Sequence, residues 1–144
     1  MIFCMKLFEA ITIVLYGMVG IISLIMAYKS ISSKRFLLFH EKAAGTSWNN
    51  VDSRLQYVIL ALTRLSGLGF LVMALILLIF PIFNYFRQDE FLKYSIPLIS
   101  LVFCSGLFLI NYLLHKQTKS PTPWKGSLYA MGAIIVGIIL SIFG

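Results

Sequence analysis

The sequence predicts an all-α membrane protein, a bundle of four transmembrane helices. Four stretches contain no Asp, Glu, Lys or Arg: residues 10–28, 65–86, 94–114 and 126–144. Each is close to the roughly 20 apolar residues that a helix needs to cross the hydrocarbon core of a bilayer. Hydrophobic residues make up 60% of the 144-residue chain, and the mean hydropathy is +0.93. This composition leaves too little polar surface for a soluble domain.

The chain is expected to form a single membrane domain with four spans, at about residues 7–28, 55–86, 94–114 and 125–144. The second span is longer than the bilayer core requires, so one of its ends must protrude or the helix must tilt. Asp52 or Asn50 can cap its start. Pro97 is expected in the first turn of the third span, where a proline costs no helical hydrogen bond.

Residues 29–54 form the longest segment outside the spans and are expected to be a cytoplasmic loop. Within it, the apolar quartet Phe36–Phe39 lies between basic residues. This pattern is typical of a short helix that lies on the membrane surface, with its lysines near anionic headgroups.

The distribution of Lys and Arg predicts the orientation in the membrane. Eight of these residues lie in residues 29–54 and 116–125, whereas three flank the spans on the other side. By the positive-inside rule, both termini should lie outside the cytoplasm. The net charge of +7 is carried by short loops next to spans, which favours anionic lipid headgroups over nucleic acid as the partner.

Polar residues within the spans are the candidates for a ligand-binding site, because each costs free energy in lipid unless it faces protein, water or a ligand. Asn111 and His115 share one face of the third helix, and Gln56 and Arg64 lie on one side of the second. We therefore expect these four residues to form a site in the cytoplasmic half. The alternative is that the polar groups form interhelical hydrogen bonds and that Arg64 extends to the interface.

Glu9 is a second candidate, because a carboxylate in the membrane can carry a proton when desolvation raises its pKa. Tyr16 and Gly20 continue the same helix face. In the alternative interpretation, Glu9 lies in the headgroup region and pairs there with Lys6, Arg87 or Lys93.

Small residues gather on one face of the fourth span: Gly126, Ala130, Ala133, Gly137 and Ser141. This spacing lets another helix approach closely, so the face is expected to be a packing surface within the bundle or between protomers. The two cysteines, Cys4 and Cys104, form no CxxC motif and have no histidine cluster near them. No metal site and no cofactor is expected.

The first span is followed by a loop of about 25 residues and then by a second apolar run. This run opens with the segment Arg64–Phe70, which reads Arg-Leu-Ser-Gly-Leu-Gly-Phe. The layout resembles the small four-helix bacterial membrane proteins grouped as DoxX-like. Some of those proteins are associated with redox or quinone-linked membrane complexes. The resemblance implies a four-helix bundle and transfers no catalytic residue.

The leading functional hypothesis is a non-enzymatic membrane protein that binds a lipid-like or quinone-like molecule or an intramembrane partner, in addition to the surrounding membrane lipids. A homo-oligomer is one form of such a partner. The first alternative is a small proton-coupled transporter that uses Glu9. The second is a membrane enzyme acting on a lipid substrate, which requires His40, His115 and Arg64 to converge.

Overall fold

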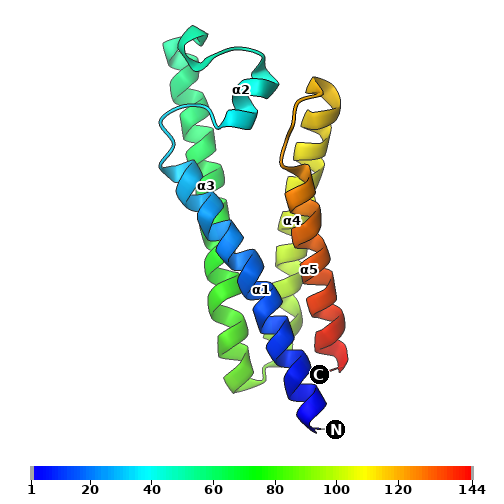
Figure 1. Ribbon diagram of the computed structural model, residues 1–144. Coiled ribbons are helices and arrows are strands. Elements are labelled where there is room, and N and C mark those ends of the chain that lie inside the picture. Colours follow the sequence, from blue (N-terminus) through cyan, green and yellow to red (C-terminus); the bar gives the residue numbers. More distant parts are fainter. Residues whose placement is uncertain (1, 144) are drawn as a thin grey trace.

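The structure is a computed structural model that describes residues 2–143, with side chains described for residues 7–142. Its elements are α1 (Ile2–Ile31), α2 (Leu38–Ala44), the 3₁₀ turn η1 (Trp48–Asn50), α3 (Ser53–Arg87), α4 (Glu90–Thr118) and α5 (Trp124–Phe143) (Figure 1). The described residues contain no strand. The all-α fold class predicted from the sequence is therefore confirmed.

Four of the helices are long and apolar enough to cross a bilayer: α1, α3, α4 and α5. This arrangement fits an integral, multi-pass membrane protein. Three of them, α1, α3 and α4, are longer than the expected spans, because they continue past the apolar segments into polar sequence. With 35 residues, α3 is about 50 Å long at 1.5 Å per residue, well beyond the ~30 Å hydrocarbon core.

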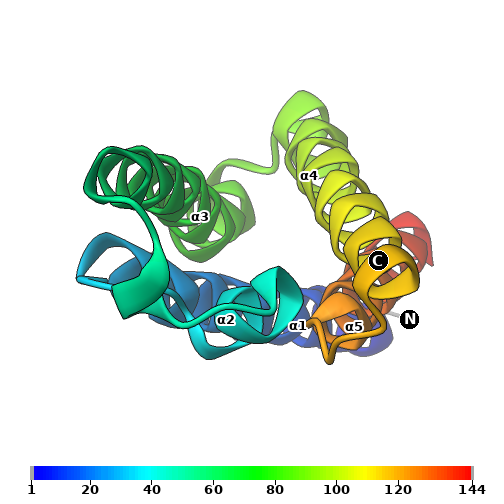
Figure 2. The same ribbon diagram turned by 90° about the horizontal axis from the view of Figure 1, so that it is seen from above.

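The helix α1 occupies a central position and packs along both α3 and α5, while α4 packs mainly on α5. Although α3 and α4 are consecutive in sequence, they touch little, and Figure 2 shows them diverging on the side of the molecule opposite α1. Aromatic side chains bridge part of this separation. The rings of Phe70 and Phe103 meet edge to face with centroids 5.6 Å apart.

Small residues permit the close approach of α1 and α3. A Cβ atom at Gly20 would lie 2.9 Å from Leu78 Cγ, and one at Gly67 would lie 2.9 Å from Ser30 Cβ. Ala27 is also buried in α1. Close backbone approach increases dispersion contact, which drives helix association where lipid is as apolar as the side chains.

Aspartates cap two of the long helices. The Asp52 carboxylate accepts a hydrogen bond from the Arg54 backbone N–H at 3.0 Å, which confirms one of the two caps expected for α3. The Asp89 carboxylate accepts from the backbone N–H groups of Phe91 and Leu92, so α4 begins at Glu90. The prediction that Pro97 lies in the first turn is therefore wrong, because this cap starts the helix seven residues before the proline.

A short helix does form in the loop between α1 and α3, but α2 begins at Leu38, later than the apolar quartet predicted. One hydrogen bond connects α2 to the α4–α5 connection, and a second joins this connection to α4. The Ser120 hydroxyl donates to the Lys42 carbonyl oxygen at 3.0 Å, and His115 Nδ1 donates to the Ser120 carbonyl oxygen at 2.7 Å. A conformation with positive φ at Gly45 ends the helix.

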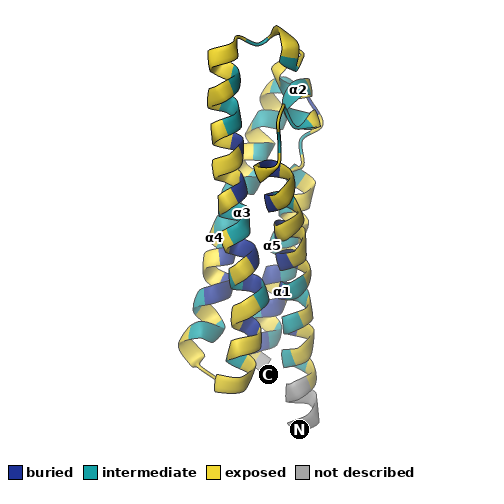
Figure 3. Cartoon of the chain, turned by 90° about the vertical axis from the view of Figure 1, so that its left-hand side faces the viewer, coloured by how far each residue is buried: buried dark blue, intermediate teal, exposed yellow. Residues whose placement is uncertain are grey.

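Buried residues line the inside of the bundle, and most outward positions on the long helices are exposed (Figure 3). Large apolar side chains such as Leu65, Val102 and Ile110 are about two-thirds exposed, as expected for residues that face lipid. Both termini and the α3–α4 connection lie at one end of the molecule (Figure 1). At the opposite end lie α2 and the α4–α5 connection.

Candidate functional site

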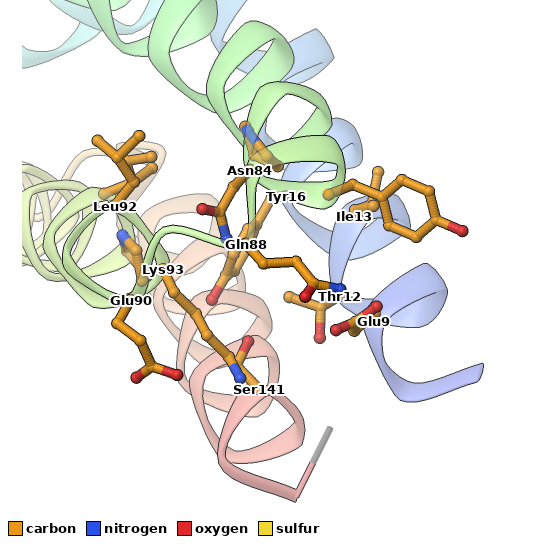
Figure 4. Close-up of a pocket in the computed structure, with 14 residues that line it drawn as sticks. Glu9, Thr12, Ile13, Tyr16, Asn84, Gln88, Glu90, Leu92, Lys93 and Ser141 are labelled. Atoms are coloured by element: carbon orange, nitrogen blue, oxygen red, sulfur yellow. The ribbon is translucent and has the colours of Figure 1, made fainter. Parts of the chain in front are cut away.

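A cavity of about 280 Å³ lies between the four long helices at the end that carries the termini. We call it the terminal cavity. Its lining residues are Glu9, Thr12, Ile13 and Tyr16 of α1, Pro81, Asn84 and Tyr85 of α3, Gln88 of the α3–α4 connection, Glu90, Leu92, Lys93, Ile96 and Pro97 of α4, and Ser141 of α5 (Figure 4).

Tyr16 provides the most deeply buried hydroxyl of this cavity. The residue is 3% exposed, and its hydroxyl has no hydrogen bond partner. The ring packs against Gly137, and the hydroxyl lies near Ser141 but outside hydrogen-bond geometry. A buried polar group without a partner costs about 1–3 kcal/mol. A buried donor without a partner therefore lies in the wall of the terminal cavity.

The two other buried hydroxyls of the cavity donate to backbone carbonyl groups, and the fourth hydroxyl belongs to the exposed Tyr85. Thr12 Oγ1 donates to the Phe8 carbonyl oxygen at 2.9 Å and lies 3.4 Å from that of Gly137. Ser141 Oγ donates to the Gly137 carbonyl oxygen at 2.9 Å. Their protons are used within the protein, so Tyr16 is the buried hydroxyl of the lining whose proton is not used.

Two buried prolines, Pro81 of α3 and Pro97 of α4, face the cavity from opposite walls. A proline inside a helix has no N–H, so the carbonyl group four residues earlier loses its helical donor. The affected carbonyls are those of Leu77 and Lys93. Both helices thus have weakened backbone hydrogen bonding at the level of the cavity.

Charged side chains of both signs surround the more exposed part of the cavity. Glu9 and Lys93 are half-buried, whereas Glu90 is exposed. The Lys93 ammonium lies 5.8 Å from the centre of the Tyr94 ring. Figure 4 shows Glu9 on α1 across the cavity from the first turns of α4, where Glu90 and Lys93 lie. The polarity of the lining increases toward the surface, and burial increases toward Tyr16.

The turn between α3 and α4, which contributes Gln88 to the cavity lining, is held by hydrogen bonds to Asn84. The Asn84 side-chain oxygen accepts a hydrogen bond from the Asp89 backbone N–H at 3.0 Å. The Gln88 backbone N–H donates to the Asn84 carbonyl oxygen at 2.7 Å, and Gln88 adopts a φ of 51°. Asn84 thus helps to fix the turn as well as lining the cavity.

A second cavity, of about 390 Å³, lies at the opposite end between α2 and α3, and we call it the α2 cavity. Its lining is mainly apolar and includes Phe36, Ile59, Leu62 and Leu114, with His40 as its one titratable side chain. Burial lowers the pKa of His40 below its usual value of 6.5, because the charged imidazolium is poorly solvated there.

The four residues predicted to form a ligand site are placed as follows. Gln56 donates from Nε2 to the carbonyl oxygens of Trp48 and Val51, and thereby connects η1 to the start of α3. Arg64 is exposed on α3. The Asn111 side chain donates to the Leu107 carbonyl oxygen of its own helix. With His115 bonded to Ser120, none of the four lines the terminal cavity or the α2 cavity.

The other residues singled out from the sequence lie in different environments. Glu9 lines the terminal cavity. On α5, Gly137 and Ser141 are buried, Ala130 and Ala133 pack beside the core, and Gly126 is exposed.

Sequence reasoning missed several residues of the terminal cavity, among them Thr12 and Asn84, and it named Lys93 only as a pairing partner of Glu9. Tyr16 was noted only as part of the face that carries Glu9. A signal was present in the sequence, because Thr12 lies three residues after Glu9 and Tyr16 seven residues after it, which places them on one helix face. Within the described residues, no group of three or more His, Cys, Asp or Glu is placed to hold a metal ion.

Comparison of the chain with protein-family models, with curated proteins and with solved structures finds no match.

Proposed function

We propose that this membrane protein is a non-enzymatic binding protein, and that the terminal cavity holds the polar end of a lipid-like or quinone-like molecule. The observation that carries the proposal is the Tyr16 hydroxyl, which is buried and has no partner in a cavity of about 280 Å³. An ester carbonyl, a phosphate oxygen or a quinone carbonyl each supplies the acceptor that this hydroxyl lacks.

The shape and lining of the cavity support a small polar group. Its volume lies near the lower end of the range for small-molecule sites, roughly 300–1,000 Å³. It therefore suits a headgroup better than a whole lipid, whose apolar part stays in the bilayer. Ile13, Leu92 and Ile96 supply the apolar wall, and convergent polar groups supply orientation, as is usual for ligand sites.

Proton-coupled transport is the second candidate function, and the position of Glu9 favours it. The carboxylate is half-buried at the cavity, where a substrate and a proton can compete for it. This candidate predicts that Glu9→Gln abolishes proton-coupled flux. A binding protein without transport shows no flux in either form.

The orientation proposed from the loop charges places the terminal cavity in the leaflet away from the cytoplasm. Its ligand then comes from that leaflet or from the aqueous phase beside it. A homo-oligomer or an intramembrane partner remains compatible with this role, because the cavity lies inside one chain.

Native mass spectrometry of the protein released from its own membranes tests the proposal. We expect one specific adduct per chain in the wild type. Tyr16→Phe removes only the hydroxyl and should lower occupancy about fivefold, the effect of a hydrogen bond worth about 1 kcal/mol. Tyr129→Phe, at an exposed position of α5, is the matched control and should retain the adduct.

Equal occupancy in the wild type and in Tyr16→Phe would refute the assignment of the site. Adducts of random lipid composition in both the wild type and Tyr16→Phe would also refute it.

A further inference from the structure

The charged groups around the terminal cavity indicate the chemical class of its ligand. We propose that the cavity binds the headgroup of a zwitterionic phospholipid that carries a primary ammonium group. This inference rests on the proposed function, because it names the ligand of the same site.

The charged residues of the lining are more exposed than Tyr16. Glu90 is exposed at the surface, Glu9 and Lys93 are half-buried, and Tyr16 is 3% exposed. The wall also includes the apolar residues Ile13 and Ile96. A phospholipid of this class presents its groups in the matching order: ammonium, phosphate, ester carbonyl and acyl chain.

Glu9 and Lys93 then each have a partner of opposite sign. The Glu9 carboxylate accepts hydrogen bonds from the ammonium group, and Lys93 donates to the phosphate. The Tyr16 hydroxyl donates to a phosphate or ester oxygen deeper in the cavity. Charged groups near low-dielectric surroundings are stabilised by such pairing and are costly without it.

Other headgroup classes match the lining less well. An anionic headgroup meets two carboxylates and a single lysine. A quinone offers acceptors to Tyr16 and Lys93 but no donor to Glu9. A quaternary ammonium has no N–H, so it cannot donate a hydrogen bond to a carboxylate.

The full-length protein in nanodiscs provides the test. The discs contain equal amounts of phosphatidylethanolamine and phosphatidylcholine with identical acyl chains, and the bound lipid is counted by native mass spectrometry after release. We expect phosphatidylethanolamine to be preferred at least tenfold, the effect of a charge-assisted hydrogen bond. Glu9→Gln should remove most of this preference, and Glu41→Gln, at the other end of the molecule, should preserve it. Lys93→Gln should weaken both lipids equally, since both carry the phosphate.

The outcomes separate the inference from the proposed function. Binding that depends on Tyr16 but shows no preference for the primary ammonium would overturn the inference and leave the proposed function in place. A quinone retained in the cavity would also overturn the inference and leave the proposed function in place. Binding that is unchanged in Tyr16→Phe would overturn both.

Discussion

The ring of Tyr16 occupies the space that a side chain at Gly137 would fill. A Cβ atom built on Gly137 would lie 2.9 Å from Tyr16 Cζ and 3.1 Å from Tyr16 Oη. The two residues join α1 to α5 beside the terminal cavity. The absence of a side chain at residue 137 therefore determines where the unpartnered hydroxyl of Tyr16 lies.

Gly137→Ala should destabilise the protein, because the added methyl group clashes with the buried ring of Tyr16. Overpacking of this kind costs about 1–3 kcal/mol. Unfolding in mixed micelles, followed by circular dichroism, measures the change. Gly132→Ala on the same helix is the control: nothing lies within 4 Å of its Cβ position, so stability should be unchanged or slightly higher. Equal stability of the two variants would contradict the packing described here.

Gly67→Ala should separate α1 from α3. Its Cβ atom would lie 2.9 Å from Ser30 Cβ and 3.1 Å from the Ile31 backbone nitrogen, and a backbone atom cannot move aside as a flexible side chain can. We expect a loss of about 1–3 kcal/mol in the free energy of unfolding. Gly106→Ala on α4, where the new Cβ meets nothing within 4 Å, is the matched control. A loss of similar size in both would indicate a general helix effect rather than a contact.

Ser120→Ala should loosen α2, because it removes the hydrogen bond from the Ser120 hydroxyl to the Lys42 carbonyl oxygen. A net loss of about 1 kcal/mol is expected for one such bond. Hydrogen exchange at residues 38–44 should become about fivefold faster. Ser127→Ala, at the start of α5, should leave exchange in α2 unchanged.

Acidification should weaken the docking of α2 through His40. Burial lowers the pKa of His40 below 6.5 in the folded protein, so the unfolded or undocked form binds the proton more readily. The contribution of neutral His40 to stability is therefore complete above about pH 6.5. It declines as the pH falls from the pKa of the unfolded form toward the lower pKa of the folded form. Hydrogen exchange of α2 at pH 7.5 and pH 5, corrected for intrinsic rates, measures the effect. His40→Gln should abolish the difference in α2 exchange between the two pH values. If the difference is unchanged in this variant, another group causes it.

Both termini should lie outside the cytoplasm. A reporter that is active only in the cytoplasm should be inactive when fused after Gly144 and active when inserted at Thr46 in the exposed segment after α2. Activity of the fusion at Gly144 would reverse the orientation. The terminal cavity would then lie in the cytoplasmic leaflet.

The number of long helices could be predicted from the sequence because the length of uncharged apolar runs depends only on local composition. The ends of these helices could not be predicted in the same way, because capping residues outside the apolar runs determine where a helix begins. Asp89 starts α4 well before the hydrophobic segment, and α1 continues through Lys29 to Ile31. Lysine near a helix C-terminus interacts favourably with the helix dipole, so it does not end the helix.

The candidate site was harder to predict, because it depends on which helices become neighbours. A site made of Gln56, Arg64, Asn111 and His115 requires the second and third spans to face each other. In the structure, α3 and α4 diverge, and α1 lies between α3 and α5. This arrangement follows from small residues on several helices at once, such as Gly20, Gly67 and Gly137, whose pairing is not contained in any single segment.

The two ends of the molecule differ sharply in charge. The end with the termini has three basic and three acidic residues, Lys6, Arg87, Lys93, Glu9, Asp89 and Glu90, so the whole net charge of +7 belongs to the end with α2. In a membrane with an electrical potential, each elementary charge moved across 100 mV changes the energy by about 2.3 kcal/mol. When the α2 end lies on the negative side, inverting the chain would therefore cost roughly 16 kcal/mol. The molecule is then held in one orientation by voltage as well as by its route of insertion. Collapse of the potential would remove that contribution without altering a single contact within the bundle.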